Sequence, residues 1–239
     1  MRDMIVGMIQ AGLRPFGAKI ARLHTERDET FRAVCVAAEV GADCILDVGA
    51  NVGQFAGEVF RNGWQGRVIS FEPLSHEHLT LTAAAAGNSR WTVATRGAIG
   101  EQAGQSEIHR AGNSASSSLL PMRREHIDAA AGSAPVGAET IEIRRLDEVD
   151  GIPREAQLFL KIDTQGYEMS VLRGAKGLMP RIKGMLVEVS FAQLYDGQPL
   201  AFEVLEHLTH LGYRVHDLTP GFYHPTTGRM LQANIIVIR

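Results

Sequence analysis

Short apolar runs alternate with amphipathic stretches along most of the chain. Runs of strand length occupy residues 44–49, 67–72, 91–99, 158–162, 184–190, 214–218 and 234–239. Apolar positions at helical spacing fill residues 21–43, 52–61, 75–86, 168–176 and 200–213. Strands that alternate with helices in this way predict an α/β fold, in which a largely parallel sheet carries helices on both faces.

Residues 111–138 differ from the rest of the chain. They are rich in Ser, Ala and Gly and show little hydrophobic periodicity. A long irregular segment inside a compact domain is typical of a lid or binding loop. The composition also allows a disordered surface insertion, and the sequence alone leaves both interpretations open.

The composition is that of a globular protein with a sizeable core, since the 239 residues are 45% hydrophobic and 21% charged. A formal net charge of −3 argues against general binding of nucleic acid. Cys35 and Cys44 are too few for a disulfide framework or a metal cluster. This favours a reducing compartment, and we expect a cytoplasmic protein.

The first 40 residues are predicted to form an N-terminal helical extension, followed by one main domain over residues 41–239. The apolar run from Met4 to Ile9 is short and amphipathic. It is a candidate for homodimer contacts or for peripheral docking at a membrane. No apolar run reaches the roughly 20 residues that a spanning helix needs, so the sequence predicts no transmembrane segment.

A glycine-rich turn follows the first strand of the main domain. Gly49 and Gly53 let the backbone approach a ligand closely, and the helix that follows offers free N–H donors. The spacing is G-x-x-x-G rather than the G-x-G-x-x-G of dinucleotide-binding turns, and Asp47 precedes the first glycine. A carboxylate is unfavourable beside a pyrophosphate dianion but favourable beside an ammonium group. The turn therefore favours S-adenosylmethionine over NAD.

Glu72 ends the second strand, about 25 residues after Asp47. A carboxylate at this position can accept two hydrogen bonds from the hydroxyls of a ribose. The turn and Glu72 together indicate an adenosine-containing cofactor. An NAD-dependent oxidoreductase and a non-catalytic cofactor-binding protein are the alternatives to a methyltransferase.

Four segments together resemble the FkbM family of S-adenosylmethionine-dependent O-methyltransferases, namely residues 45–55, 70–73, 161–175 and 185–191. Many class I methyltransferases share the glycine turn, and the block at 161–175 is the family-specific part. The resemblance implies a doubly wound, mostly parallel Rossmann-like sheet of about seven strands with an antiparallel last strand. It also implies S-adenosyl-L-methionine as cofactor and methyl transfer to a hydroxyl, usually on a sugar of a glycolipid, polysaccharide or secondary metabolite.

The resemblance also assigns cofactor positions at the carboxyl ends of the strands. Glu72 would hold the ribose, and Asp163 would lie beside the cofactor. The remaining positions are Asp47, Gly49, Asn51 and Gly53 at the methionine end, Ala98 and Ile99 near the adenine, and Ser117 closing over it.

Asp163 is the predicted catalytic base. It ends an apolar strand, and ligands of open α/β sheets bind at the carboxyl ends of the strands. A carboxylate there can take the proton of the acceptor hydroxyl as the methyl group transfers. Glu188, near the end of the next strand, is the second candidate catalytic residue, and His126, His216 and His224 are alternative bases.

Two carboxylates at neighbouring strand ends are also an arrangement that can hold Mg²⁺, which would lower the pKa of the acceptor hydroxyl. Val189 and Ser190 follow Glu188, so no third acidic ligand is evident. Many relatives have an acid where this chain has Gln165, which lowers the negative charge here. The sequence therefore does not favour Mg²⁺ as a cofactor.

Overall fold

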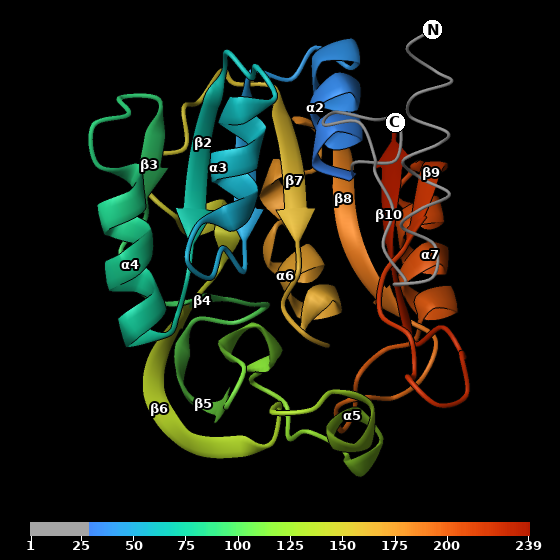
Figure 1. Cartoon of the computed structure of the whole chain (residues 1–239). Coiled ribbons are helices and arrows are strands. Elements are labelled where there is room, and N and C mark those ends of the chain that lie inside the picture. Colours follow the sequence, from blue (N-terminus) through green and yellow to red (C-terminus); the bar gives the residue numbers. More distant parts are fainter. Residues whose placement is uncertain (1–28) are drawn as a thin grey trace, which may run out of the picture.

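Seven strands form the main sheet of the computed structural model, which describes residues 29–239. The strand order is β3-β2-β1-β7-β8-β10-β9, in which β10 is antiparallel to both neighbours and the other pairs are parallel (Figure 1). The strands are β1 (Cys44–Val48), β2 (Arg67–Phe71), β3 (Trp91–Val93), β7 (Leu158–Ile162), β8 (Ile182–Ser190), β9 (Arg214–Pro220) and β10 (Gln232–Ile238). The predicted mostly parallel sheet with an antiparallel last strand is confirmed.

Helices cover both faces of this sheet. One face packs against α2 (Glu29–Glu39), α3 (Gln54–Arg61) and α4 (Ser75–Ala85), and the other against α6 (Glu168–Gly174) and α7 (Ala201–His210). All residues of β1 and β7 are buried, because a strand between two helical layers has no side that faces solvent. This is why both strands appear in the sequence as nearly continuous apolar runs.

A smaller sheet with strand order β4-β6-β5 lies beneath the carboxyl ends of the parallel strands (Figure 1). Its strands are β4 (Ala98–Ile99), β5 (Gly104–Ala111) and β6 (Pro135–Arg144). The predicted strand 91–99 is thus divided, since β3 belongs to the main sheet and β4 to the smaller one. Ile108 and Ile141 of the smaller sheet pack together with Leu74, which precedes α4.

The serine-rich segment between β5 and β6 is structured. Residues 112–134, which we call the cap, contain the 3₁₀ turn η2 (Ser114–Ser116) and α5 (Arg124–Ala129). Ala129 belongs to the same buried apolar cluster as Leu194 and Tyr195, so the cap is packed against the loop that follows β8.

The predicted N-terminal extension falls only partly within the described residues. α2 ends at Glu39, whereas residues 1–28, with the predicted dimer or membrane contact, lie outside the described part of the chain.

Two further 3₁₀ turns are η3 (Leu146–Glu148) and η4 (Lys176–Leu178). Within residues 29–239, no helix has the length and apolar character needed to cross a membrane.

Candidate active site

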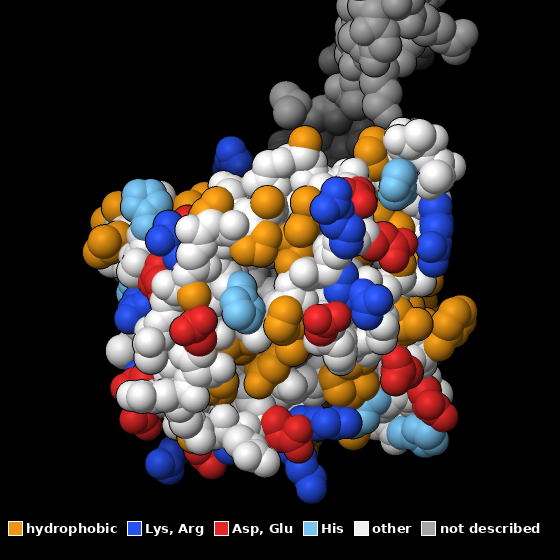
Figure 2. All heavy atoms as spheres, turned by 90° about the horizontal axis from the view of Figure 1, so that it is seen from below, with side chains coloured by type: hydrophobic (Ala, Val, Ile, Leu, Met, Phe, Trp, Pro, Cys, Tyr) orange, Lys and Arg blue, Asp and Glu red, His pale blue; other side chains and the backbone are white. Residues whose placement is uncertain are grey.

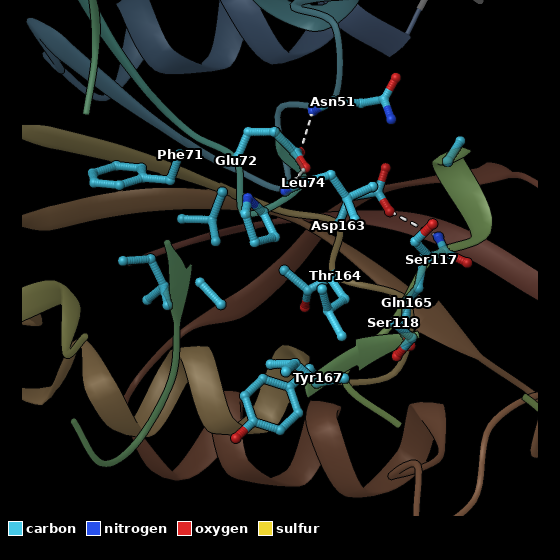
Figure 3. A pocket seen from close by; sticks show the side chains of 18 of the residues that line it. Asn51, Phe71, Glu72, Leu74, Ser117, Ser118, Asp163, Thr164, Gln165 and Tyr167 are labelled. Atoms are coloured by element: carbon cyan, nitrogen blue, oxygen red, sulfur yellow. Dashed lines mark hydrogen bonds between the residues drawn. The ribbon is translucent and has the colours of Figure 1, made fainter. Parts of the chain in front are cut away.

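A cavity that opens to solvent lies between the carboxyl ends of β1, β2 and β7 and the smaller sheet (Figure 3). The predicted site residues that line it are Gly49, Asn51, Glu72, Ala98, Ile99, Ser117 and Asp163. Further lining residues come from the cap and from the turn after β7, so the cap forms part of the wall.

The turn after β1 lies directly against the end of β7. Gly49 has φ +79, a left-handed conformation that glycine adopts without strain. A Cβ atom at this position would stand 1.8 Å from the carbonyl oxygen of Asp163, so only glycine fits. The amides of Gly49 and Ala50 also donate to the carbonyl of Phe71, at 3.1 and 3.0 Å. The glycine turn therefore joins the ends of β2 and β7 in one wall of the cavity.

Asp47 is fully buried in β1 and does not line the cavity. Its carboxylate pairs with Lys161 Nζ at 3.1 Å and accepts a hydrogen bond from the Ser70 hydroxyl at 3.0 Å. Lys161 Nζ also donates to the carbonyl of Gly49 at 2.7 Å. Burial lowers the pKa of Lys161, but the charges of Asp47 and Asp163 outweigh this effect and the net pKa is raised. The ion pair therefore supports the glycine turn from inside the sheet.

The positions of Asp47 and Gly53 differ from the prediction that both lie at the methionine end. The pairing of β1 with β7 places Lys161 directly opposite Asp47, so the acid is neutralised within the sheet. Gly53 also lies outside the cavity lining, and its Cβ would meet Leu81 and Trp91 at 2.9 Å. This glycine therefore permits close packing at the start of α3.

Glu72 follows β2 and lines the cavity with a carboxylate of fixed orientation (Figure 3). Its Oε2 accepts from the backbone amide of Asn51 and its Oε1 from that of Leu74, each at 2.8 Å. Burial raises the pKa of Glu72 to about 7, although these two amides act in the opposite direction. Glu72 is therefore a positioned acceptor that titrates near neutral pH.

The part of the lining around β4 is mainly apolar. Ser117 of the cap lines this part as well, and its Oγ accepts from the backbone amide of Ala111 at 3.0 Å. The apolar side chains are Phe71, Leu74, Ala98, Ile99, Ile108 and Leu119. They form a surface suited to a planar aromatic ring.

Asp163 directly follows β7, and its side chain is 41% exposed. Its Oδ1 accepts from Gln165 Nε2 at 2.9 Å, and its Oδ2 lies 3.9 Å from Lys161 Nζ. Among the described residues that line the cavity, Asp163 and Glu72 are the only acids. The Asp163 carboxylate can accept a proton from a bound group.

Glu188 on β8 lies outside the cavity lining. Its Oε2 accepts from the side-chain amides of Gln165 and Gln232, both at 2.7 Å. Burial and the negative charge of Asp163 raise the pKa of Glu188 well above its usual value. The structure therefore places this predicted catalytic residue beside Asp163 but not in contact with the cavity.

Glu168 organises the turn between β7 and α6. Its Oε1 accepts from the Thr164 amide at 3.1 Å, the Thr164 hydroxyl at 3.2 Å and the Gly166 amide at 3.0 Å. Burial raises the pKa of Glu168 to about 7. The glutamate of the K-I-D-x-x-G-x-E block thus shapes the turn that presents Asp163 to the cavity.

Replacing Glu168 with glutamine is expected to weaken the dependence of stability on pH. The folded pKa of about 7 exceeds the ordinary 4.5, so between these values the folded chain holds a proton that the unfolded chain releases. This stabilisation is complete below pH 4.5 and is lost as pH rises through 7, at a cost on the order of 3 kcal/mol. Glutamine keeps the accepting oxygen but does not titrate.

Denaturant unfolding of the wild type and Glu168→Gln between pH 5 and 8 measures this effect. Glu206→Gln, at an exposed glutamate of α7, is the matched control and should follow the wild type. Parallel pH curves for the wild type and Glu168→Gln would contradict the assignment.

Some lining residues were not indicated by the sequence pattern. Ser114 of the cap lines the cavity and accepts from the predicted site residue Asn51, Nδ2 to Oγ at 3.1 Å, a contact that depends on how the cap folds. Tyr167 lines the cavity too, and its place inside the family-specific block was the available signal. The three candidate histidines lie outside the lining. Within residues 29–239, no three His, Cys, Asp or Glu side chains are grouped to hold a metal ion.

The mostly parallel seven-stranded sheet and the cavity beside a glycine turn agree with the Rossmann-like methyltransferase fold that the sequence resemblance implies. The sequence profile of the Methyltransferase FkbM domain matches residues 47–215. The chain therefore belongs to the FkbM methyltransferase family, and S-adenosylmethionine is its methyl donor. This assignment replaces the alternative of an NAD-dependent oxidoreductase.

Solved structures similar to this chain share little sequence with it. The precorrin-6y C5,15-methyltransferase of Geobacter metallireducens GS-15 has 11% identity and a TM-score of 0.46, with 92% of each chain covered. The 1,6-didemethyltoxoflavin-N1-methyltransferase of Burkholderia thailandensis has 12% identity and a TM-score of 0.47, with 100% of this chain and 86% of that chain covered. An rRNA methylase of Streptococcus thermophilus has 11% identity and a TM-score of 0.48, with 92% of this chain and 99% of that chain covered. No curated protein matches the chain.

The residues of the cavity fit S-adenosylmethionine. The fixed carboxylate of Glu72 suits a ribose diol, and the apolar surface around β4 suits an adenine ring. Gly49, which has no room for a side chain, leaves the backbone of the turn open to the methionine end. Asp163 lies against this turn, so the candidate base and the backbone that would hold the methionine end share one wall of the cavity.

Proposed function

We propose that the protein transfers a methyl group to a hydroxyl, on a sugar of a glycolipid, polysaccharide or secondary metabolite. The observation that carries this proposal is the partly exposed carboxylate of Asp163 in the cavity wall, on a residue whose backbone carbonyl lies against Gly49. A neutral amine can attack a methyl group unaided, whereas a hydroxyl gains most from a positioned base. A carboxylate at this place therefore supports an oxygen acceptor.

Charge on the surrounding surface supports an uncharged acceptor. Figure 2 shows acidic, basic and apolar side chains interspersed on the face that the cap and the smaller sheet form. Arginines there pair with acids, namely Arg96 and Arg110 with Glu139, Arg123 with Asp196, and Arg229 with Glu125. A nucleic acid would favour a surface with excess positive charge. Mixed charge is suited to a polar, neutral sugar.

The arrangement suggests how the chain's own residues act. Bound S-adenosylmethionine supplies an electrophilic methyl group on a sulfonium. Glu72 would hold the ribose, and the backbone of the glycine turn would hold the methionine end. Asp163 would accept a hydrogen bond from the acceptor hydroxyl, orient its oxygen in line with the methyl group, and take the proton as the bond forms.

Mass spectrometry of carbohydrate and glycolipid extracts tests the proposal. Cells that lack the protein should accumulate a product lighter by one methyl group than that of wild-type cells. The wild-type chain should restore the mass and Asp163→Asn should not. Unchanged carbohydrates, with a methyl group missing from RNA or protein instead, would contradict the proposed substrate class.

Replacing Glu72 with glutamine is expected to weaken S-adenosylmethionine binding about tenfold and to remove its dependence on pH. Only the ionised carboxylate accepts freely from ribose hydroxyls, and the pKa of Glu72 is about 7. The wild-type Kd should therefore fall about tenfold as pH rises from 6 to 8. Titration calorimetry measures both effects, with Glu107→Gln at an exposed position of β5 as control. Wild-type affinity in Glu72→Gln would exclude a ribose contact.

A further inference from the structure

Gln165 joins the two carboxylates at the ends of β7 and β8. Its Nε2 donates to Asp163 Oδ1 at 2.9 Å and to Glu188 Oε2 at 2.7 Å. An amide nitrogen has two hydrogens, so both are used on these acids. The neutral amide thus occupies the place between two carboxylates where a bound cation would otherwise reduce their repulsion.

The orientation of the Gln165 amide follows from the acceptors around it. Gln165 Oε1 lies 3.0 Å from the hydroxyl of Tyr195, which also lies 2.8 Å from the carbonyl of Ser116 in the cap. Burial raises the pKa of Tyr195, so its hydroxyl keeps its single proton, which is shared between these two oxygens. Because Asp163 Oδ1 and Glu188 Oε2 both accept, the amide nitrogen faces them and the amide oxygen faces Tyr195.

The backbone of Gln165 is held in place as well. Its φ of +54 is unusual for a residue other than glycine, and such conformations persist where the surroundings determine them. Ser118 of the cap donates its hydroxyl to the Gln165 carbonyl at 2.7 Å. Gln198 fixes the Tyr195 loop by accepting from the backbone amides of Leu194 and Tyr195. Both the main chain and the side chain of Gln165 are therefore tied to the cap and its neighbouring loop.

We propose that Gln165, which also contacts Tyr195, is the positioning residue that holds the Asp163 carboxylate in its catalytic orientation. This inference rests on the proposed role of Asp163 as the base. The hydrogen bond from Gln165 Nε2 to Asp163 Oδ1 fixes the direction of this carboxylate in the cavity wall. The Tyr195 hydroxyl connects Gln165 to the Ser116 carbonyl, so the cap takes part in this support.

Replacement of Gln165 by leucine removes the donors at similar size and should lower kcat on the order of tenfold or more. The KM for S-adenosylmethionine should change by less than about twofold, because Gln165 positions the base and does not hold the cofactor. Tyr195→Phe should lower kcat by a smaller factor. Gln193→Leu, at an exposed glutamine near Tyr195, is the matched control and should leave both unchanged.

A double-mutant cycle of Gln165→Leu and Asp163→Asn identifies the route of action. If Gln165 acts through Asp163, adding Gln165→Leu to Asp163→Asn should lower kcat by less than about twofold. An equal fall in both backgrounds, or an unchanged kcat in Gln165→Leu, would overturn the proposal. Full turnover by Asp163→Asn alone would instead overturn the role of Asp163, and the two failures are thus distinguishable.

Discussion

Replacing Asp163 with asparagine is expected to lower kcat by about 10²- to 10⁴-fold, the range that general base catalysis contributes. The amide keeps the size of the side chain but cannot take a proton from the acceptor. Because Asp163 contacts the glycine turn through its backbone carbonyl, the turn should keep its shape. Steady-state assays with methyl-labelled S-adenosylmethionine measure the loss of turnover.

The matched control is Asp128→Asn, at an exposed aspartate that pairs with Arg124 within α5. It should retain wild-type kcat, since a surface pair of this kind contributes little. Calorimetry should show that Asp163→Asn still binds S-adenosylmethionine within a few-fold of the wild type. Wild-type turnover by Asp163→Asn would remove Asp163 from the mechanism.

Replacing Gly49 with alanine is expected to weaken S-adenosylmethionine binding at least tenfold and to lower kcat/KM by about 10²-fold. The new Cβ would stand 1.8 Å from the Asp163 carbonyl oxygen, so the turn after β1 and the end of β7 must move apart. A displacement of about 1 Å at a catalytic site can cost 10²-fold in rate. Alanine is also strained at a φ of +79. Calorimetry and initial rates measure the two effects.

Gly57→Ala provides the control for this substitution. Gly57 lies within α3, and a Cβ atom added there would have open space for 4 Å around it among the described residues. Alanine at this position should leave activity unchanged and stabilise the helix by roughly 0.5–1 kcal/mol. An active, fully binding Gly49→Ala protein would show that the turn does not touch β7 as described.

The main sheet could be predicted because its central strands are buried on both faces. Continuous apolar runs identify β1 and β7 without any knowledge of their partners. The glycine turn and Glu72 were predictable for a related reason, since each directly follows such a strand. Because the carboxyl ends of parallel strands lie at the same edge of a sheet, the glycine turn and Glu72 are expected at one edge.

The partners of individual polar groups could not be predicted in the same way. Asp47 pairs with Lys161 because β1 and β7 are neighbours in a particular register, and sequence pattern does not give that register. The cap lacks periodicity because its serines make hydrogen bonds to loops, as Ser118 does to Gln165. The bridge that Gln165 forms between two carboxylates depends on all of these contacts at once.

The most direct test of the account is the fate of a labelled methyl group. The purified protein is incubated with S-adenosylmethionine carrying a ¹³C methyl group and a sugar acceptor, and the product is examined by nuclear magnetic resonance. The account predicts a methyl ether on a sugar oxygen, formed by the wild type and reduced on the order of 100-fold or more in Asp163→Asn. A label on nitrogen or carbon, or equal rates for the two proteins, would contradict it.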